Sequence, residues 1–167
     1  FFMNLTAWMV VIIITNSLTR YGGDVAVGAY GIINRFLFFF VMIVIGLMQG
    51  MQPIVGYNYG AKLYNRAFKA LKLSIMFATF ISVIGFLLGE FFPDMITSMF
   101  TTDKQLTEIA ASGMRIMMMA VPLLGIQVIS TGFFQSIGYV KTAIFLSLLR
   151  QLILIIPALL VFPLFFG

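Results

Sequence analysis

The sequence predicts an all-α integral membrane protein with five transmembrane helices. Hydrophobic residues make up 62% of its 167 residues and the mean hydropathy is +1.10. Charged residues account for only 9%, roughly a third of their usual share in a soluble domain. Five stretches are apolar and long enough to cross a bilayer. The charges between these stretches alternate in sign along the chain.

The alternating charges also predict the orientation of the helices. The segment 61–72 carries basic residues and no acid, whereas the span 90–115 is mainly acidic. Lys and Arg accumulate in cytoplasmic loops, so 61–72 is predicted inside and 90–115 outside. Residue 1 is then inside and residue 167 outside. The basic residues are Lys62, Arg66, Lys69 and Lys72, and the acids are Glu90, Asp94, Asp103 and Glu108, accompanied by Lys104 and Arg115.

Composition also argues against several classes of function. The net charge of +5 does not indicate nucleic-acid binding, because the central basic residues adjoin a hydrophobic run, where such residues anchor a helix at the membrane surface. The chain has no Cys and no His, so no thiolate, disulfide or metal site is expected. The apolar stretches hold no paired carboxylates, and we expect no enzyme activity.

The first two helices are expected at about residues 1–18 and 27–56. The chain begins with Phe inside an apolar run, and we interpret it as a piece of a longer protein. Tyr21-Gly22-Gly23-Asp24 is predicted to be a loop between the two helices. In the basic segment 61–72 the charges are spaced by four, three and three positions. This spacing places them on one helical face, as in a helix lying in the headgroup plane.

Three further helices are expected at about 73–89, 115–138 and 142–162. Before the second of these, Thr101-Thr102-Asp103 is a capping signal that predicts a new helix starting near Lys104. Pro122 and Pro157 are predicted to kink the last two helices.

Two runs of large apolar residues, Met117–Met119 and Phe36–Phe40, need a separate explanation. Consecutive residues circle a helix, so the members of each run cannot all point inward. We therefore expect both runs to face mostly lipid, although soft Met surfaces also suit varied apolar ligands.

The most specific string runs from Gly46 to Lys62 and reads GLMQGMQPIVGYNYGAK. Its glycines form two pairs four residues apart, a spacing that lets helix backbones approach closely. Pro53 interrupts helical hydrogen bonding, and the carbonyls it frees need protein or water around them. Two interpretations stay open: helix packing with an interfacial Tyr belt, or a broken helix that lines a transporter cavity. The residues of note are Gln49, Gly50, Gln52, Pro53, Gly56, Tyr57, Asn58 and Gly60.

This string resembles the Q-G-x-Q-P-I-x-G-Y-N-Y-G-A-K signature in the C-terminal lobe of multidrug and toxic compound extrusion (MATE) transporters. Residues 21–32, 132–138 and 147–157 resemble further segments of that lobe, in the same order. The resemblance covers nearly the whole chain. It implies a MATE C-terminal lobe that lacks its last helix and the entire N-terminal lobe.

The resemblance implies cation-coupled export of drugs or organic cations across the bacterial cytoplasmic membrane. Family members place two six-helix lobes around a V-shaped cavity and work by alternating access, in exchange for H⁺ or Na⁺. Some members carry a cation-binding carboxylate in the helices that correspond to 1–18 and 115–138, whose cores hold no acid here. We therefore expect the coupling ion to bind in the missing N-terminal lobe, and no other cofactor. The expected partners are the lipid bilayer, the substrates and that lobe.

Arg150 is the one charge well inside an expected crossing. An arginine there costs at least ~2.5 kcal/mol on insertion scales, so it should face the bundle interior or water. Gln127, on the preceding helix, is a candidate neutral partner. A purely structural role and a role in the substrate cavity both stay open for Arg150. The candidate cavity residues are Arg150, Gln127, Asn34, Gln49, Gln52 and Gln135.

Two other functions compete with drug export. A lipid-linked oligosaccharide flippase of the same superfamily would line a larger cavity with several Arg and Lys, whereas one buried Arg is expected here. A non-transporting membrane scaffold, held together by the small-residue pairs, is the alternative from a different class. Water-accessible positions inside the helices would distinguish a transporter from a scaffold.

Overall fold

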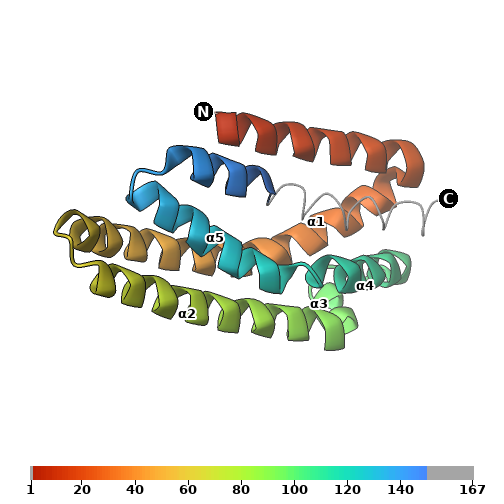
Figure 1. The fold of residues 1–167 in the computed structure, drawn as a ribbon. Coiled ribbons are helices and arrows are strands. Elements are labelled where there is room, and N and C mark those ends of the chain that lie inside the picture. Colours follow the sequence, from red (N-terminus) through yellow and green to blue (C-terminus); the bar gives the residue numbers. More distant parts are fainter. Residues whose placement is uncertain (1, 150–167) are drawn as a thin grey trace.

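Helices make up nearly all of the chain that the structure, a computed structural model, describes, namely residues 2–149, with side chains for Val25 and residues 27–149. No strand occurs in residues 2–149, and the all-α fold class is confirmed. Figure 1 shows the helices packed side by side. They are α1 (Phe2–Gly60), α2 (Tyr64–Phe91), α3 (Pro93–Ser98), α4 (Lys104–Met118), α5 (Val121–Ser136) and a further apolar helix, Val140–Leu149.

The expected loop at residues 21–24 is helical, so two expected helices form the single element α1. In Figure 1 the red and orange parts of α1 run in different directions, because the helix bends sharply between them. The expected loop contained Gly22 and Gly23, and glycine pairs let a helix bend while its backbone stays helical. The helix also continues to Gly60, beyond the expected end at 56.

The third expected helix begins earlier than predicted, because α2 starts at Tyr64 and not at residue 73. Most of the basic segment is therefore the first turns of α2 and not a separate helix. The turn before it is tight: the N–H of Leu63 donates to the carbonyl of Asn58 at 2.8 Å, and that of Lys62 to Tyr59 at 3.0 Å. Lys62 adopts a positive φ of 61°, the left-handed conformation that closes many helix ends.

The predicted helix start near Lys104 is confirmed, since α4 begins there. The Asp103 carboxylate accepts hydrogen bonds from the backbone N–H groups of Gln105 and Leu106, at 2.9 and 3.4 Å. The helix expected at 115–138 is interrupted, however: α4 ends at Met118, and α5 follows at an angle of 50°. Pro122 lies in the first turn of α5, where its missing N–H is tolerated, so the predicted kink becomes a break.

Two helices of the described chain are long and apolar enough to cross a membrane, Val27–Gly60 and Tyr64–Phe91. A third crossing is obtained if α4 and α5 form one bent span. The expected helix at 142–162 begins with Val140–Leu149 and then leaves the described residues, as does Pro157. The number of five crossings therefore stays a prediction.

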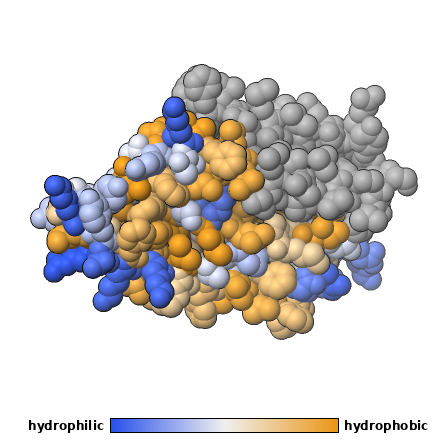
Figure 2. Space-filling view, in the orientation of Figure 1, coloured by the Kyte–Doolittle hydropathy of each residue, from blue (hydrophilic) through white to orange (hydrophobic). Residues whose placement is uncertain are grey.

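The surface has the distribution of a membrane protein. In Figure 2 apolar residues cover the middle of the face, and hydrophilic residues gather toward its ends, including the end that carries the α1–α2 turn in Figure 1. Large side chains such as Phe39, Phe80 and Phe91 are more than half exposed, which water would penalise and lipid would not.

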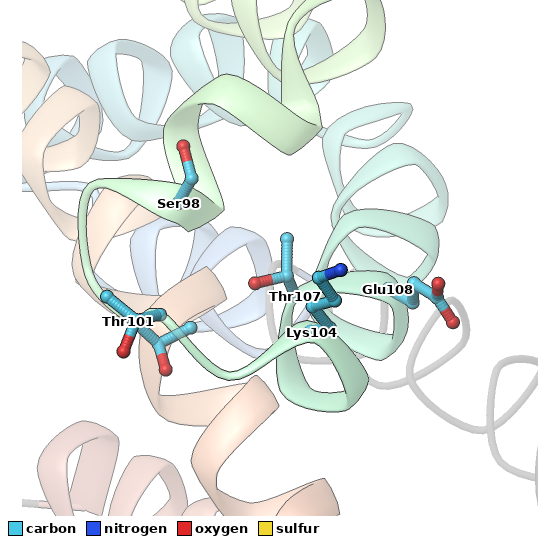
Figure 3. Close-up of a pocket in the computed structure, with 6 residues that line it drawn as sticks. Ser98, Thr101, Lys104, Thr107 and Glu108 are labelled. Carbon is cyan, nitrogen blue, oxygen red and sulfur yellow. The ribbon is translucent and has the colours of Figure 1, made fainter.

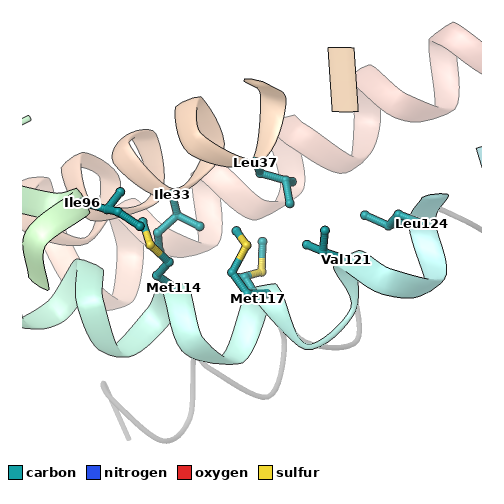
Figure 4. Packing of buried hydrophobic residues seen from close by; sticks show 8 residues of the cluster. Ile33, Leu37, Ile96, Met114, Met117, Val121 and Leu124 are labelled. Atoms are coloured by element: carbon teal, nitrogen blue, oxygen red, sulfur yellow. The ribbon is translucent and has the colours of Figure 1, made fainter. Parts of the chain in front are cut away.

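One hydrophobic core lies where α1 meets α3, α4 and the start of α5 (Figure 4). Met114 and Met118 are fully buried in it and Met117 nearly so, while Met119 is 63% exposed. The expectation that Met117–Met119 face mostly lipid is therefore wrong for two of the three. Unbranched Met side chains fill the irregular space that the helix break leaves.

The Phe36–Phe40 run meets the expectation only in part. Phe38 and Phe39 are exposed, but Leu37 and Phe40 are buried. Phe40 packs against α2 at Gly85, where an added Cβ would lie 2.9 Å from the Phe40 ring. A second core joins α1, α2 and α5 around Val55, Ala78 and Ile129.

Candidate functional site

Two of the predicted cavity residues meet where α1 crosses α5. The Gln52 side-chain Nε2 donates a hydrogen bond to Oε1 of Gln135 at 3.1 Å. Gln52 is half-buried and Gln135 exposed. An amide pair of this kind links two helices in a surrounding that offers few other polar partners.

The backbones of α1 and α5 come close at this point because Gly132 has no side chain. A Cβ on Gly132 would overlap Cγ of Met48 and would lie 3.6 Å from Nε2 of Gln52. One turn later the position of a Gly56 Cβ is 3.6 Å from the carbonyl oxygen of Ser136. The residues that hold the amide pair together are therefore two glycines and Met48.

The other glycines of the Gly46–Lys62 string do not make the close packing that their spacing predicted. Around Gly46, Gly50 and Gly60, an added Cβ would have no atom within 4 Å in the described part of the chain. Of this string, only Gly56 approaches another helix. A spacing of four residues places glycines on one helix face, but tertiary packing decides whether a neighbour covers that face.

Pro53 does not break α1, which stays helical through this position. Its missing N–H still removes the helical donor to the carbonyl of Gln49, four residues earlier. Asn58 Nδ2 donates to the carbonyl of Ile54 at 2.8 Å, so this amide supports the backbone locally. The interpretation as a broken, cavity-lining helix is therefore wrong in its geometry, because the helix continues.

The remaining members of the string lie on the surface. Gln49 is exposed, one turn before Gln52, and Tyr57 is 78% exposed. Tyr59 packs edge-to-face against Tyr64, with ring centroids 5.2 Å apart. These aromatic rings lie beside the α1–α2 turn, a position typical of interfacial tyrosines.

Gln127 is a buried amide on α5 with a different partner. Its Nε2 donates a hydrogen bond to the carbonyl of Leu146, on the Val140–Leu149 helix. Its Oε1 is shielded and has no partner among the described residues. Arg150, four positions after Leu146, lies outside the described residues, so the proposed pairing of Gln127 with Arg150 stays a prediction.

Asn34 is not brought to the amide pair. It is half-buried on α1, eighteen residues before Gln52, and this separation is about 27 Å along a helix. Gln127 and Gln135 are eight residues apart on α5, about 12 Å by the same rise. The candidate residues are therefore distributed along the lobe, with one direct contact, between Gln52 and Gln135.

Titratable groups form no obvious ion site in the described part of the chain. No three His, Cys, Asp or Glu side chains there gather into a group that could hold a metal ion. Glu90 is the one unusual acid: it lies in the last turn of α2, half-buried, and its Oε2 is shielded without a partner among the described residues. Sequence reasoning had placed Glu90 in a polar span and missed this burial.

A polar pocket of about 420 Å³ lies between α3 and α4. Figure 3 shows hydroxyl side chains from the α3 end and from α4 near Lys104 and Glu108. The pocket belongs to the span predicted outside the membrane, away from the amide pair. Its lining residues are Ser98, Thr101, Thr102, Lys104, Thr107 and Glu108.

Sequence reasoning also missed the glycines that bring α5 against its neighbours. Gly125 and Gly132 are seven residues apart, two helical turns, and both lie at contacts too close for a side chain. This spacing was a usable signal, since Gly recurring on one helix face indicates close backbone packing. Met48 gave no such signal, because nothing distinguishes it from the other methionines of α1.

Comparisons with known proteins agree on one family. The sequence profile of the MatE family matches residues 1–160. The chain is 29% identical to "Multidrug export protein MepA" of Staphylococcus aureus (strain MSSA476) over 155 residues, and 28% identical to the protein of that name in Staphylococcus haemolyticus (strain JCSC1435) over 145. These alignments cover 93% and 87% of this chain but 34% and 32% of those proteins, so the chain spans about a third of their length.

A solved structure is similar over almost the entire chain. The MATE multidrug transporter DinF-BH, solved in complex with a drug, matches with a TM-score of 0.79 and 39% sequence identity. The match covers 99% of this chain and 37% of that transporter.

Proposed function

This chain belongs to the MatE family, and we propose that it is part of a transporter that exports drugs or organic cations from bacteria by alternating access. The observation that carries the proposal is the match over 99% of the chain to a multidrug transporter at 39% identity. That transporter was solved with a drug bound to it. The relatives are transporters, and we propose a non-catalytic role here as well.

Within this lobe, we assign a role in transport to the Gln52–Gln135 pair. It is a polar contact between α1 and α5 in a mainly apolar lobe, and it lies in the segment that resembles the family signature. A lobe that rocks during alternating access needs helices that keep their mutual position. The exposed face of Gln135 is also free to meet a substrate or the rest of the transporter.

The proposal further places the coupling ion, H⁺ or Na⁺, in the part of the protein outside this chain. Antiport needs a site that responds to ion occupancy, a role suited to a buried carboxylate. The acids of this chain, Asp24, Glu90, Asp94, Asp103 and Glu108, lie at helix ends or in the expected extramembrane spans. The basic α1–α2 turn is proposed to face the cytoplasm, as the distribution of positive charge predicts.

Drug export by cells that express the full-length transporter tests the proposal, with the compound bound in the DinF-BH structure as the probe. The double variant Gln52→Leu, Gln135→Leu is expected to export it about three- to tenfold more slowly at normal membrane abundance, the loss that one interhelical hydrogen bond can cause. Gln105→Leu, an exposed change on α4, is the matched control and should leave export unchanged. Absence of export by the unaltered protein would favour the flippase or scaffold alternatives.

The same measurement tests the place of the coupling site. Neutralising all five acids should leave the dependence on the H⁺ or Na⁺ gradient intact, with at most a modest loss of rate through folding. If neutralising one of them, Glu90 above all, abolishes ion dependence while the drug still binds, the coupling site lies in this chain.

A further inference from the structure

An open groove of about 650 Å³ runs between α1 and α2. On the α1 side it passes over Gly46 and Gly50, where an added Cβ would meet no atom within 4 Å in the described chain. The walls are apolar, and Ile54 and Leu73 in them are half exposed. The groove is therefore a channel along the helices that small residues keep open.

Two cations stand at the end of this groove nearest the α1–α2 turn. Arg66 and Lys69 line it from the first turns of α2, three residues apart and both exposed. No acid occurs between them and Glu90, at the far end of α2, about 32 Å further along the helix. The charged end of the groove is thus cationic and has no carboxylate of its own helix to neutralise it.

The length of the groove matches one leaflet of a bilayer. Its lining on α1 extends from Ile43 to Ile54, eleven residues or about 16 Å of helix. The hydrocarbon core of a membrane is about 30 Å thick, so one leaflet accounts for about 15 Å. An apolar channel of this depth with cations at its outer end has the dimensions and polarity of a single phospholipid.

We propose that this groove binds an anionic phospholipid, with an acyl chain along Gly46 and Gly50 and the phosphate at Arg66 and Lys69. Basic pockets between transmembrane helices on the cytoplasmic side are suited to acidic headgroups. A protein helix in the same place would have to bring acids to the two cations, whereas a phospholipid provides the anion and the apolar chain together. The inference concerns lipid contact and holds whether or not the protein exports drugs.

Binding of phosphatidylglycerol to the purified full-length protein, measured by native mass spectrometry with phosphatidylcholine as the neutral comparison, tests the headgroup contact. The Arg66→Gln, Lys69→Gln variant is expected to bind phosphatidylglycerol about tenfold more weakly. The matched control is Lys62→Gln, Lys72→Gln, which removes the same charge from the same segment but outside the groove. It should stay within about twofold of the unaltered protein, because those charges act only at a distance. Equal weakening by both pairs would show diffuse attraction and overturn the proposal.

A second pair of variants tests the acyl-chain contact while both cations stay in place. Gly46→Leu, Gly50→Leu fills the groove and should weaken phosphatidylglycerol binding to a similar degree. Gly31→Leu, at an equally open and exposed position outside the groove, should not. Unchanged binding after filling would contradict the proposal, as would a cross-link from a Cys at Gly50 to another protein segment, which would identify a helix or a second copy as the occupant.

Discussion

At the scale of single residues, Gly125 lies where α5 comes closest to α2. A Cβ at this position would overlap the Ser82 hydroxyl and would lie 2.9 Å from the carbonyl oxygen of Ala78. The Ser82 side chain can turn away, but the carbonyl belongs to the α2 backbone and can move only if the helix moves. The contact therefore depends on the absence of one methyl group.

Gly125→Ala is expected to destabilise the full-length protein by about 1–3 kcal/mol, the usual result of overpacking a tight contact. Gly46→Ala is the matched control, since nothing lies within 4 Å of its Cβ position in the described chain, and Ala favours helix more than Gly does. Thermal unfolding in detergent measures both. Equal stability of the two variants would show that α5 and α2 are further apart than described here.

At the scale of the element, α4 depends on the residue that precedes it. The first N–H groups of a helix have no partner within the helix, and the Asp103 carboxylate accepts from two of them. The Thr107 hydroxyl also donates to the Asp103 carbonyl at 2.8 Å. This first turn positions the rest of α4, whose Met114 and Met118 fill the core against α1.

Asp103→Ala should therefore loosen the start of α4 at a cost of about 1 kcal/mol. Hydrogen exchange at the Gln105 and Leu106 amides is the sensitive measurement, and it should accelerate while amides of α2 keep their protection. Asp103→Asn keeps an acceptor oxygen and should exchange almost as slowly as the unaltered protein. If the alanine variant exchanges no faster, the carboxylate does not cap this helix in solution.

At the scale of the whole molecule, α2 determines how the two loop regions relate to the membrane. It has 28 residues, or about 42 Å of helix, which exceeds the ~30 Å hydrocarbon core. Exposed Asn65 lies in its first turn, and exposed Ser98 at the end of α3, just beyond its other end. The two residues are therefore proposed to lie on opposite sides of the membrane.

Single Cys substitutions measure this arrangement in cells, in a full-length protein without other reactive Cys. Asn65→Cys should react with a membrane-impermeant maleimide only after the cytoplasmic side is opened, and Ser98→Cys should react from outside. Labelling of both from the same side would refute the proposed orientation and the crossing of α2.

Local signals determined much of this protein from the sequence alone. The apolar stretches predicted an α-helical membrane protein, Asp103 predicted the start of α4, and Pro122 predicted a kink where the structure has a break. The string around Gln52 and Pro53 indicated the family that the profile and the solved structure support. Each of these signals acts through residues close together in the chain, where hydrogen bonding and side-chain transfer to lipid depend on local identity.

Tertiary structure alone decided which faces of the helices meet. It buries Met117 and Met118, leaves Gly46 and Gly50 open, and joins Gln52 to Gln135 across 83 positions of sequence. In a chain that is apolar on nearly every helix face, hydrophobicity does not distinguish a face that meets another helix from one that meets lipid. The rotation of each helix is then set by close contacts between distant residues, such as Gly125 with α2, and the sequence pattern of one helix does not contain that information.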